Sequence, residues 1–395
     1  MDSSQLASVF LKPNREEAVK RLHPWIFSGA IVRMDGSPQD GDVVEVYDHR
    51  GNYLATGNFH NGSIAVKIIS YERLVPDAAF WQRKLQNAKL ARSIVAAPNS
   101  TCYRLVHGEG DGMPGLIIDF YDGVAVLQAH SIGMYRSLPD ISLALQAVYG
   151  PELRAIYQKS KETLPDEFAQ SVQNGYLFGT CAVPHAVLEN GHTFLIDWET
   201  GQKTGFFIDQ RDNRALLGHY AAGKRVLNAF CYSGGFSVYA LAAGAESVDS
   251  VDASKRAVEL VKRNVAVNFG DISNHQAHAE DVLAFLKRNP EPYDLMILDP
   301  PAYAKNIAAR HRAVQGYKRL NAEGIRHLKP NGILFTFSCS QVVDRDLFYN
   351  TVVSAALEVG RQVRVLHQLT QASDHPVNFF HPEGSYLKGL VLLVE

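Results

Sequence analysis

Cysteine is scarce in this sequence of 395 residues, which contains only Cys102, Cys181, Cys231 and Cys339. The four lie far apart and form no CxxC pair, which argues against a zinc site and a disulfide framework. Apolar runs are also short, and none approaches the roughly 20 residues needed to span a bilayer. The opening residues Met1–Gln5 lack the basic and apolar regions of a signal peptide. We therefore expect a cytoplasmic protein with no metal and no membrane segment.

An excess of positive charge is missing too. Lysine and arginine number 39 against 41 aspartate and glutamate residues, a formal net charge of −2. Composition therefore neither favours nor opposes a nucleic acid partner, which would have to be bound by local basic patches. The hydrophobic content of 46% is ordinary for a globular protein. The length is sufficient for two or three domains.

The sequence pattern changes twice along the chain, which predicts domains at residues 1–73, 74–190 and 191–395. In the first segment, short β-runs such as Asp42–Tyr47 and Ile64–Ile69 alternate with Gly, Asn and Asp, as in a small β-barrel. The second segment begins with a predicted helix at Ala78–Val95. It continues with two β-runs joined by Tyr121–Gly123, a hairpin signal.

From about His192 onward, strands alternate with helices. The predicted strands are Arg225–Phe230, Ser247–Val251, His275–Ala279, Leu295–Leu298 and Ile333–Phe337. Helices are predicted between them at Ser254–Asn268, Val282–Lys287 and Tyr317–His327. This alternation indicates a doubly wound α/β sheet with parallel strands. Ligands of such sheets bind beyond the carboxyl ends of the strands.

The first of these strand ends carries the loop Asn228–Ser237. Gly234 and Gly235 allow a tight turn that brings backbone N–H groups against a ligand. The loop matches neither G-x-G-x-x-G nor a phosphate-binding G-x-x-x-x-G-K-[ST] loop, which disfavours a nicotinamide dehydrogenase. A glycine pair that only makes a turn is the simpler explanation of the loop taken alone.

Acidic residues follow the next two strands. Asp252 could hold two ribose hydroxyls, and Ser254 is the better cap of the following helix. Asp281 could accept a hydrogen bond from an adenine amino group, or it could be a charge at a helix start. Together with the glycine loop they predict an adenosyl ligand, S-adenosylmethionine.

The fourth and fifth strands end in Asp299–Pro301 and Thr336–Ser340, which predicts that Asp299 and Cys339 face one cleft. A free cysteine is more often a small core residue than a nucleophile, but opposite a carboxylate it suggests thiolate attack on C6 of a pyrimidine. Asp299, protonated or bonded to N3, would stabilise the adduct. C5 would then accept a methyl group, and Glu383 or a water would remove the C5 proton.

Several long motifs resemble the ribosomal RNA large-subunit methyltransferase I family, whose members methylate C5 of a cytosine in 23S rRNA. These motifs are His23–Gly29, Gly108–Gly115, Lys203–Asp212, the glycine loop, Asp299–Pro301, Phe337–Ser340 and Pro382–Gly389. The resemblance implies an N-terminal PUA β-barrel, a central α/β domain with a β-hairpin, and a Rossmann-like class I methyltransferase domain. It also implies an RNA partner, naked or immature 23S rRNA, and leaves monomer and homodimer open.

The resemblance further implies the roles of individual residues. Cys339 and Asp299 would be catalytic, and Lys203–Arg211 would close over the cofactor and the substrate entrance. Cofactor contacts are expected from Phe207, Gln210, Arg211, Asn228, Phe230, Tyr232, Ser233, Gly234, Gly235, Asp252, Ala253, Asp281 and Asp299.

The sequence departs from the family pattern in two places. Ala302 follows Asp299–Pro301, where family members often carry lysine, and this puts RNA affinity in question. A second cysteine after the Pro-Pro corner is absent, so the group that removes the C5 proton stays open. Methylation of an exocyclic base amine, with Tyr303 stacking on the base, is one alternative, and a non-catalytic RNA-binding assembly protein is another.

Basic residues in the first and last domains are candidates for contacts with RNA phosphates, although each could equally be a solvated surface charge. They are Lys20, Arg21, Arg33, Lys305, Arg310 and Arg312. The stretch Lys305–Lys318 is the strongest candidate because it follows the Asp299–Pro301 corner. Phosphate contacts would make RNA affinity fall as the salt concentration rises.

Overall fold

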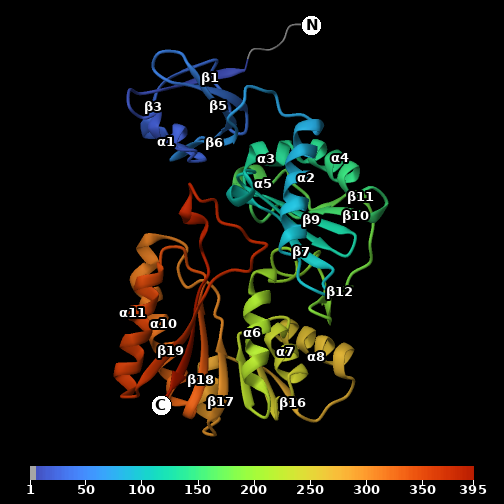
Figure 1. The fold of residues 1–395 in the computed structure, drawn as a ribbon, viewed down its shortest axis with the longest axis vertical. Helices are drawn as coiled ribbons and strands as arrows, with labels where there is room; N and C mark the ends of the chain where they lie inside the picture. The colour runs from blue at the N-terminus through green and yellow to red at the C-terminus, as the bar shows by residue number, and fades with distance from the viewer. Residues whose placement is uncertain (1–5) are drawn as a thin grey trace. The chain divides into compact units, whose positions relative to one another are not determined.

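The computed structural model describes residues 6–395, and the expectation for Met1–Gln5 lies outside them. The chain forms two compact units. Unit 1 contains the described part of Met1–Val187 together with Ile196–Phe206 and Ser373–Gly384. Unit 2 contains Leu188–Leu195, Phe207–Ala372 and Ser385–Glu395. Both units therefore draw on chain segments that are distant in sequence (Figure 1).

The first part of unit 1 is a six-stranded sheet in the order β2-β6-β5-β4-β1-β3, with one short helix, α1. Their bounds are β1 Ala7–Leu11, α1 Glu17–Lys20, β2 Trp25–Phe27, β3 Ile31–Asp35, β4 Val43–Tyr47, β5 Tyr53–Phe59 and β6 Ile64–Ser70. Alternate apolar residues such as Val9, Leu11, Val44 and Val46 pack into its core. The short strands expected from the turn residues are therefore confirmed.

The second part of unit 1 is a five-stranded sheet in the order β11-β10-β9-β8-β7, on which α2 and α4 pack together. The bounds are α2 Ala78–Ile94, β7 Cys102–His107, β8 Leu116–Tyr121, β9 Val124–Ala129, α3 Ile132–Arg136, α4 Leu138–Tyr149, β10 Ala155–Gln158, α5 Asp166–Ala169 and β11 Gly175–Gly179. Asp122 and Gly123 both have positive φ, the conformation of a tight hairpin turn. The predicted hairpin is confirmed.

Unit 2 is built on a seven-stranded sheet in the order β16-β15-β14-β17-β18-β20-β19. The strands are β14 Arg225–Ala229, β15 Ser247–Asp252, β16 His275–Ala279, β17 Tyr293–Leu298, β18 Leu328–Ser338, β19 Val363–Leu369 and β20 Lys388–Val394. All neighbours pair in parallel except β20, which runs antiparallel to both β18 and β19. A two-stranded hairpin, β12 His185–Glu189 and β13 His192–Ile196, precedes this sheet in the chain.

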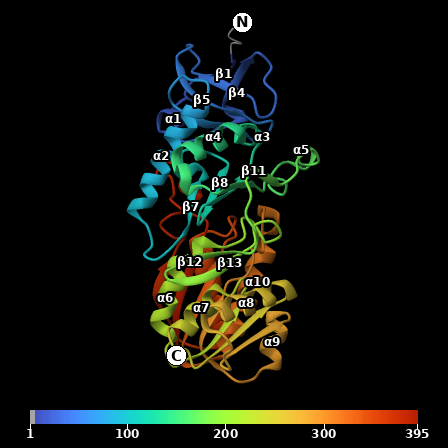
Figure 2. The ribbon, with the colours of Figure 1, turned by 90° about the vertical axis from the view of Figure 1, so that its right-hand side faces the viewer.

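Helices cover both faces of the seven-stranded sheet, which makes a three-layer α/β structure. They are α6 Arg211–Ala221, α7 Gly235–Ala242, α8 Lys255–Phe269, α9 Val282–Arg288, α10 Arg310–Arg326 and α11 Arg345–Val359. Helices α10 and α11 pack together on one side, and α6, α7 and α8 on the other (Figure 1). The second group faces the viewer in Figure 2. The apolar core between the sheet and α9, α10 and α11 includes Leu227, Leu298 and Phe348.

The predicted α/β alternation is confirmed, but the structure also differs from the prediction. Helix α10 begins at Arg310, seven residues before the predicted start at Tyr317. Helix α11 and strands β19 and β20 were not predicted, and β20 reverses the direction of the sheet edge. The division of residues 1–190 into two domains stays a prediction, because both sheets belong to unit 1. Within residues 6–395 the structure contains no helix that could cross a membrane.

Candidate active site

The glycine loop after β14 contains residues in the left-handed backbone conformation and leaves no room for a side chain at Gly234 or Gly235. Phe230, Tyr232 and Gly234 all have positive φ, at 60°, 43° and 75°. A Cβ on Gly234 would lie 2.9 Å from a methyl carbon of Val261, and one on Gly235 would lie 2.8 Å from Cδ of Arg214. Only glycine fits at both positions. The backbone of the loop is therefore free of side chains at these two positions, which fits a cradle for the adenosyl ligand.

Asp252 joins this loop to the end of β15. One carboxylate oxygen accepts from the backbone N–H of Tyr232 at 3.1 Å, and the other from that of Ser254 at 2.9 Å. Ser254 caps α8, as predicted. We expected the Asp252 carboxylate to be available entirely for a ligand, but each of its oxygens already accepts a backbone hydrogen bond. Each oxygen retains a second lone pair for a ribose hydroxyl, and the exposed Ala253 lies beside it.

Two other residues that were predicted to contact the cofactor form hydrogen bonds within the protein. Asp281 is exposed and caps α9, since its carboxylate accepts from the backbone N–H of Ala284 at 2.9 Å. Asn228 is buried, and its amide donates to Oγ of Ser237 at 2.8 Å. Asn228 could therefore offer a ligand only its backbone. Asp281 retains one carboxylate oxygen for an adenine amino group.

The end of β17 contains a carboxyl group with a strongly shifted pKa. Nε2 of the buried Gln210 donates to Asp299 at 3.0 Å, and Asn213 in turn donates to Gln210 at 2.6 Å. Desolvation, reinforced by the nearby Asp209 carboxylate, raises the pKa of Asp299 to about 7. Asp299 can therefore donate a proton near neutral pH, which is the state that the sequence-based mechanism requires.

The segment before α6 contributes further predicted residues. Phe207 contacts Tyr232 edge-on, with ring centroids 5.1 Å apart. Its carbonyl accepts from Arg214, which forms a buried bidentate ion pair with Glu189. Arg211 is 1% exposed, so its guanidinium faces protein rather than solvent. The rigid start of α6 thus fixes Phe207 beside the glycine loop.

Cys339 follows β18 and adjoins a buried lysine. In the antiparallel pair of β18 and β20, Ser338 lies opposite Lys388. The Lys388 ammonium donates to the carbonyl oxygen of Ser340 at 2.8 Å, one peptide unit from Cys339. Lys388 is 5% exposed, and no ion pair to it exists within residues 6–395. Burial lowers the pKa of Lys388 to about 8, against the opposing effect of the Cys339 thiolate.

The neighbouring residues explain which other groups face this corner. The Tyr317 hydroxyl and Oγ of Ser340 lie 2.9 Å apart, and Ser340 Oγ accepts from the backbone N–H of Ala304. Tyr303 packs on Tyr317 with ring centroids 4.6 Å apart. These contacts tie the loop after Asp299–Pro301 to the end of β18. The ends of β17 and β18 are adjacent because these strands pair.

Sequence reasoning did not assign a role to Lys388, although the motif Pro382–Gly389 was recognised. A signal was available, because Lys388 is a lone charge before the apolar run Leu390–Val394. Buried lysines without a carboxylate are costly and mark functional sites. The ion pair of Arg214 with Glu189 was also missed, since its partners are 25 residues apart.

Two further cysteines and the basic candidates lie outside the group just described. Cys102 and Cys231 are buried, and burial raises the pKa of the Cys231 thiol. Arg33 binds Asp35 and covers the Phe10 ring. Of the remaining basic candidates, Lys20 pairs with Glu16 and Glu17, while Arg21, Lys305, Arg310 and Arg312 are exposed.

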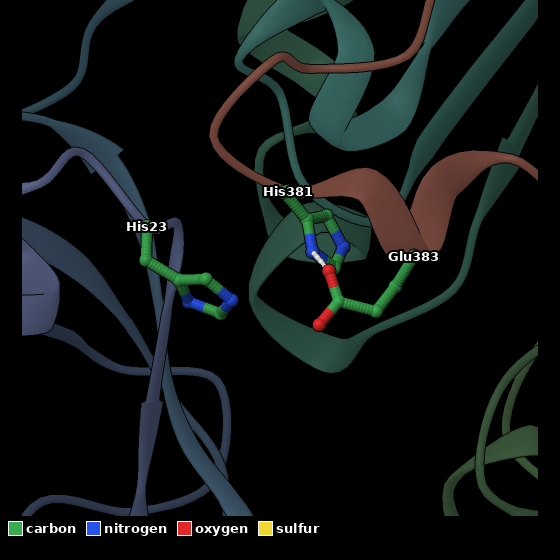
Figure 3. Close-up of side chains that lie close together, drawn as sticks. All are labelled: His23, His381 and Glu383. Carbon is green, nitrogen blue, oxygen red and sulfur yellow. Dashed lines mark hydrogen bonds and ion pairs between the residues drawn. The ribbon is translucent and has the colours of Figure 1, made fainter.

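One group with metal-ligand character exists within residues 6–395, formed by His23, His381 and Glu383 in unit 1. Figure 3 shows the His23 ring turned towards the other two side chains. Nδ1 of His381 is 2.7 Å from Oε2 of Glu383, so these two atoms already satisfy each other. The expectation that the protein needs no metal stays a prediction.

Comparison with known proteins identifies the family. A model of S-adenosylmethionine-dependent methyltransferases matches residues 103–379, and a PUA-like domain matches residues 9–71. Ribosomal RNA large subunit methyltransferase I of Alteromonas mediterranea is 39% identical over 98% of both chains. The protein of the same name from Aeromonas hydrophila is 40% identical over 98% of this chain and 99% of its own. The chain belongs to the ribosomal RNA large subunit methyltransferase I family.

Solved structures of methyltransferases have the same fold as this chain. A SAM-dependent methyltransferase from Streptococcus mutans is 26% identical, with a TM-score of 0.83 over 98% of this chain and 100% of its own. A methyltransferase solved with SAH is 26% identical, with a TM-score of 0.84 and the same coverage. The predicted fold, a Rossmann-like methyltransferase domain with a PUA-like domain at the N-terminus, is confirmed. S-adenosylmethionine is the cofactor, as predicted.

Proposed function

We propose that the protein methylates C5 of a cytosine in the RNA of the large ribosomal subunit, through a covalent adduct with Cys339. The family membership supports methyl transfer to this class of RNA. The observation that carries the finer assignment is the buried ammonium of Lys388, which donates to the carbonyl of Ser340 and interacts electrostatically with Cys339. A cation next to a thiol favours the thiolate, which is the nucleophilic form.

The residues at the ends of β17 and β18 supply the nucleophile and the proton donor for the chemistry on the base. The Cys339 thiolate adds to C6, and Asp299 gives its proton to N3 as negative charge develops on the ring. S-adenosylmethionine supplies an electrophilic methyl group to C5 when it is bound. A base then takes the C5 proton, the electron pair of that C–H bond restores the ring double bond, and the Cys339 sulfur leaves C6 as a thiolate. N3 returns its proton to Asp299, which restores the carboxylic acid. Glu383, which the sequence offers as that base beside a bound water, belongs to unit 1 and is hydrogen-bonded to His381.

Methylation of an exocyclic amine fits the site less well. That reaction needs an aromatic ring free to stack on the base, and Tyr303 is the only aromatic directly after the Pro-Pro corner. Its ring packs against Tyr317, and a Cβ on Gly316 would lie 3.0 Å from it. The reaction also needs no thiol, so it gives no reason for Lys388 to be buried beside Cys339.

The test is to compare Cys339→Ala with Cys181→Ala, both on protein-free large-subunit rRNA. We expect Cys339→Ala to abolish methylation and Cys181→Ala to retain it, because Cys181 is a free cysteine of unit 1 outside the proposed site. RNA containing 5-fluorocytidine should form an adduct with the wild-type enzyme that survives denaturing electrophoresis, since fluorine cannot be removed as a proton. Wild-type methylation by Cys339→Ala would exclude the covalent mechanism.

A further inference from the structure

Unit 1 exposes an unusual set of aromatic side chains. Phe379 is 91% exposed, Phe380 48% and Phe27 50%. The rings of Phe379 and Phe380 meet edge-on with centroids 5.7 Å apart. Exposed single apolar residues are common, but neighbouring exposed aromatic rings indicate an interaction site. None of these three rings has a part in the proposed chemistry.

Ring contacts connect the two chain segments that carry these residues. Trp25 and His381 lie 4.2 Å apart between ring centroids, and His23 lies 5.3 Å from His381. His23 is also 6.4 Å from Phe27. His381 therefore joins residues 23–27 by ring contacts, and the ring pair Phe379 and Phe380 directly precedes it in the chain; Figure 3 shows His23 and His381. We call this group the aromatic platform, made of His23, Trp25, Phe27, Phe379, Phe380 and His381.

The aromatic platform is fixed by hydrogen bonds to Glu109. Its carboxylate accepts from the Trp25 indole at 2.9 Å, and its backbone carbonyl accepts from the Asn378 amide at 3.2 Å. Asn378 also accepts from the backbone N–H of Phe380 at 2.8 Å. A Cβ on Gly110 would lie 2.0 Å from the carbonyl oxygen of Pro376, so the two backbones touch there. The exposure of the rings is thus built into the fold, and binding would cost little ordering entropy.

Positive charge adjoins the aromatic platform. A groove of about 290 Å³ is lined by Trp25, Phe27 and the exposed Arg15, among others. Neither Arg15 nor Arg21 forms an ion pair within residues 6–395. A guanidinium without a carboxylate beside open ring faces matches the two features of a nucleotide, its phosphate and its base.

We propose that the aromatic platform binds unpaired nucleotides of the RNA substrate, with bases stacked on Phe379 and Phe380 and a phosphate on Arg15. This proposal rests on the proposed function for the identity of the RNA, and it adds a contact surface made of residues other than those that act on the base. A protein partner is the other possible occupant, but it would not require the unpaired guanidinium. A substrate with exposed single-stranded segments follows, such as rRNA before its assembly.

Fluorescence anisotropy with a labelled single-stranded RNA of about twelve nucleotides, a length within the site sizes of such proteins, tests the proposal on the full chain. The variant Phe379→Ala with Phe380→Ala should bind about tenfold more weakly or worse, because each base stack is lost. The slope of the logarithm of its RNA affinity against the logarithm of the salt concentration should equal that of the wild type. Arg15→Gln should instead reduce the slope by about one phosphate contact.

Ile94→Ala is the matched control, because Ile94 is an equally exposed apolar residue of unit 1, at 79%. It should bind RNA as the wild type does, and Phe379→Tyr should retain most of the affinity. Wild-type RNA affinity in the double phenylalanine variant, or equal loss in Ile94→Ala, would overturn the proposal. Binding is measured without methyl transfer, so a failure of the Cys339 mechanism leaves this result interpretable.

Discussion

The ends of β14 and β15 and the ends of β17 and β18 lie on the same edge of one parallel sheet, yet they present different kinds of groups. The first pair presents backbone, shaped by Gly234 and held by Asp252. The second pair presents side chains whose ionisation the protein has shifted, Asp299 and Lys388. In the function proposed above, the shape of the first pair would hold the cofactor, whereas the shifted pKa values of the second pair would serve the reaction. The contrast can be tested residue by residue.

Removing the Lys388 charge should have the largest effect at the reactive end. In Lys388→Met the neighbouring positive charge is lost, so a smaller fraction of Cys339 should be thiolate, and methylation at pH 7 should fall about tenfold or more. The loss should shrink as pH rises, because the thiolate returns. Iodoacetamide alkylation of Cys339 against pH, followed by peptide mass, measures the thiol directly.

Other groups near this corner make the control necessary. Tyr317, Asp344 and Arg345 also act electrostatically on Cys339 or Lys388, and Asp299 lies on the next strand. Lys388→Arg should restore most of the thiol reactivity. Lys329→Met, at the opposite end of β18 and paired with Asp294, should leave it unchanged. An unchanged alkylation profile in Lys388→Met would remove Lys388 from the mechanism.

Adding a methyl group at Gly234 should lower the affinity for S-adenosylmethionine without changing the reactivity of Cys339. Gly234→Ala forces a Cβ to 2.9 Å from Val261 at a φ of 75°, a strain of about 1–3 kcal/mol that distorts the loop. We expect S-adenosylmethionine affinity by calorimetry to fall about tenfold or more, with the alkylation profile of Cys339 unchanged. Gly244→Ala has a similar φ of 84° and open space around it, so its cofactor affinity should equal that of the wild type.

The Asp299 carboxyl should make stability depend on pH. Its pKa is about 7 in the folded protein, above the unfolded value, so the folded state holds the proton longer as pH rises. Stability should therefore fall between about pH 4 and pH 7, and Asp299→Asn should melt about 3 °C higher than the wild type at pH 8. The two should melt alike at pH 4.

Asp294→Asn provides the opposite sign. Bonds from the Arg225 backbone and from Lys329 lower the pKa of Asp294, despite its desolvation. Its contribution to stability is present above the unfolded pKa, so Asp294→Asn should melt lower than the wild type at pH 8. If Asp299→Asn also melts lower at pH 8, the carboxyl is not destabilised by its surroundings as the structure indicates.

The smallest effect is expected at Asp281. Because this exposed residue caps α9 as well as facing the ligand edge, Asp281→Asn should retain the cap. Only the adenine contact would then weaken, and we expect a loss of about two- to fivefold in S-adenosylmethionine affinity. Asp281→Ser, which also caps, should behave alike. A larger loss in either variant would place Asp281 among the main cofactor residues.

The sequence by itself determined the strands of the parallel sheet, the glycine loop and the positions of Asp252, Asp281, Asp299 and Cys339 at successive strand ends. Local periodicity and turn residues carry this information, because parallel strands place their carboxyl ends on one edge. Family motifs added the methyltransferase reaction and its cofactor.

Only the tertiary structure decided which of these groups already form hydrogen bonds within the protein and which have shifted pKa values. The Asp252 carboxylate already accepts two hydrogen bonds from backbone N–H groups, and the side-chain amide of the buried Asn228 donates to Ser237. Lys388 reaches Cys339 because β20 returns antiparallel to β18 from almost 50 residues away, and the aromatic platform joins residues 23–27 to 379–381. Ionisation and exposure depend on what surrounds a group in space. Neighbours that are distant in sequence leave no local pattern from which they could be read.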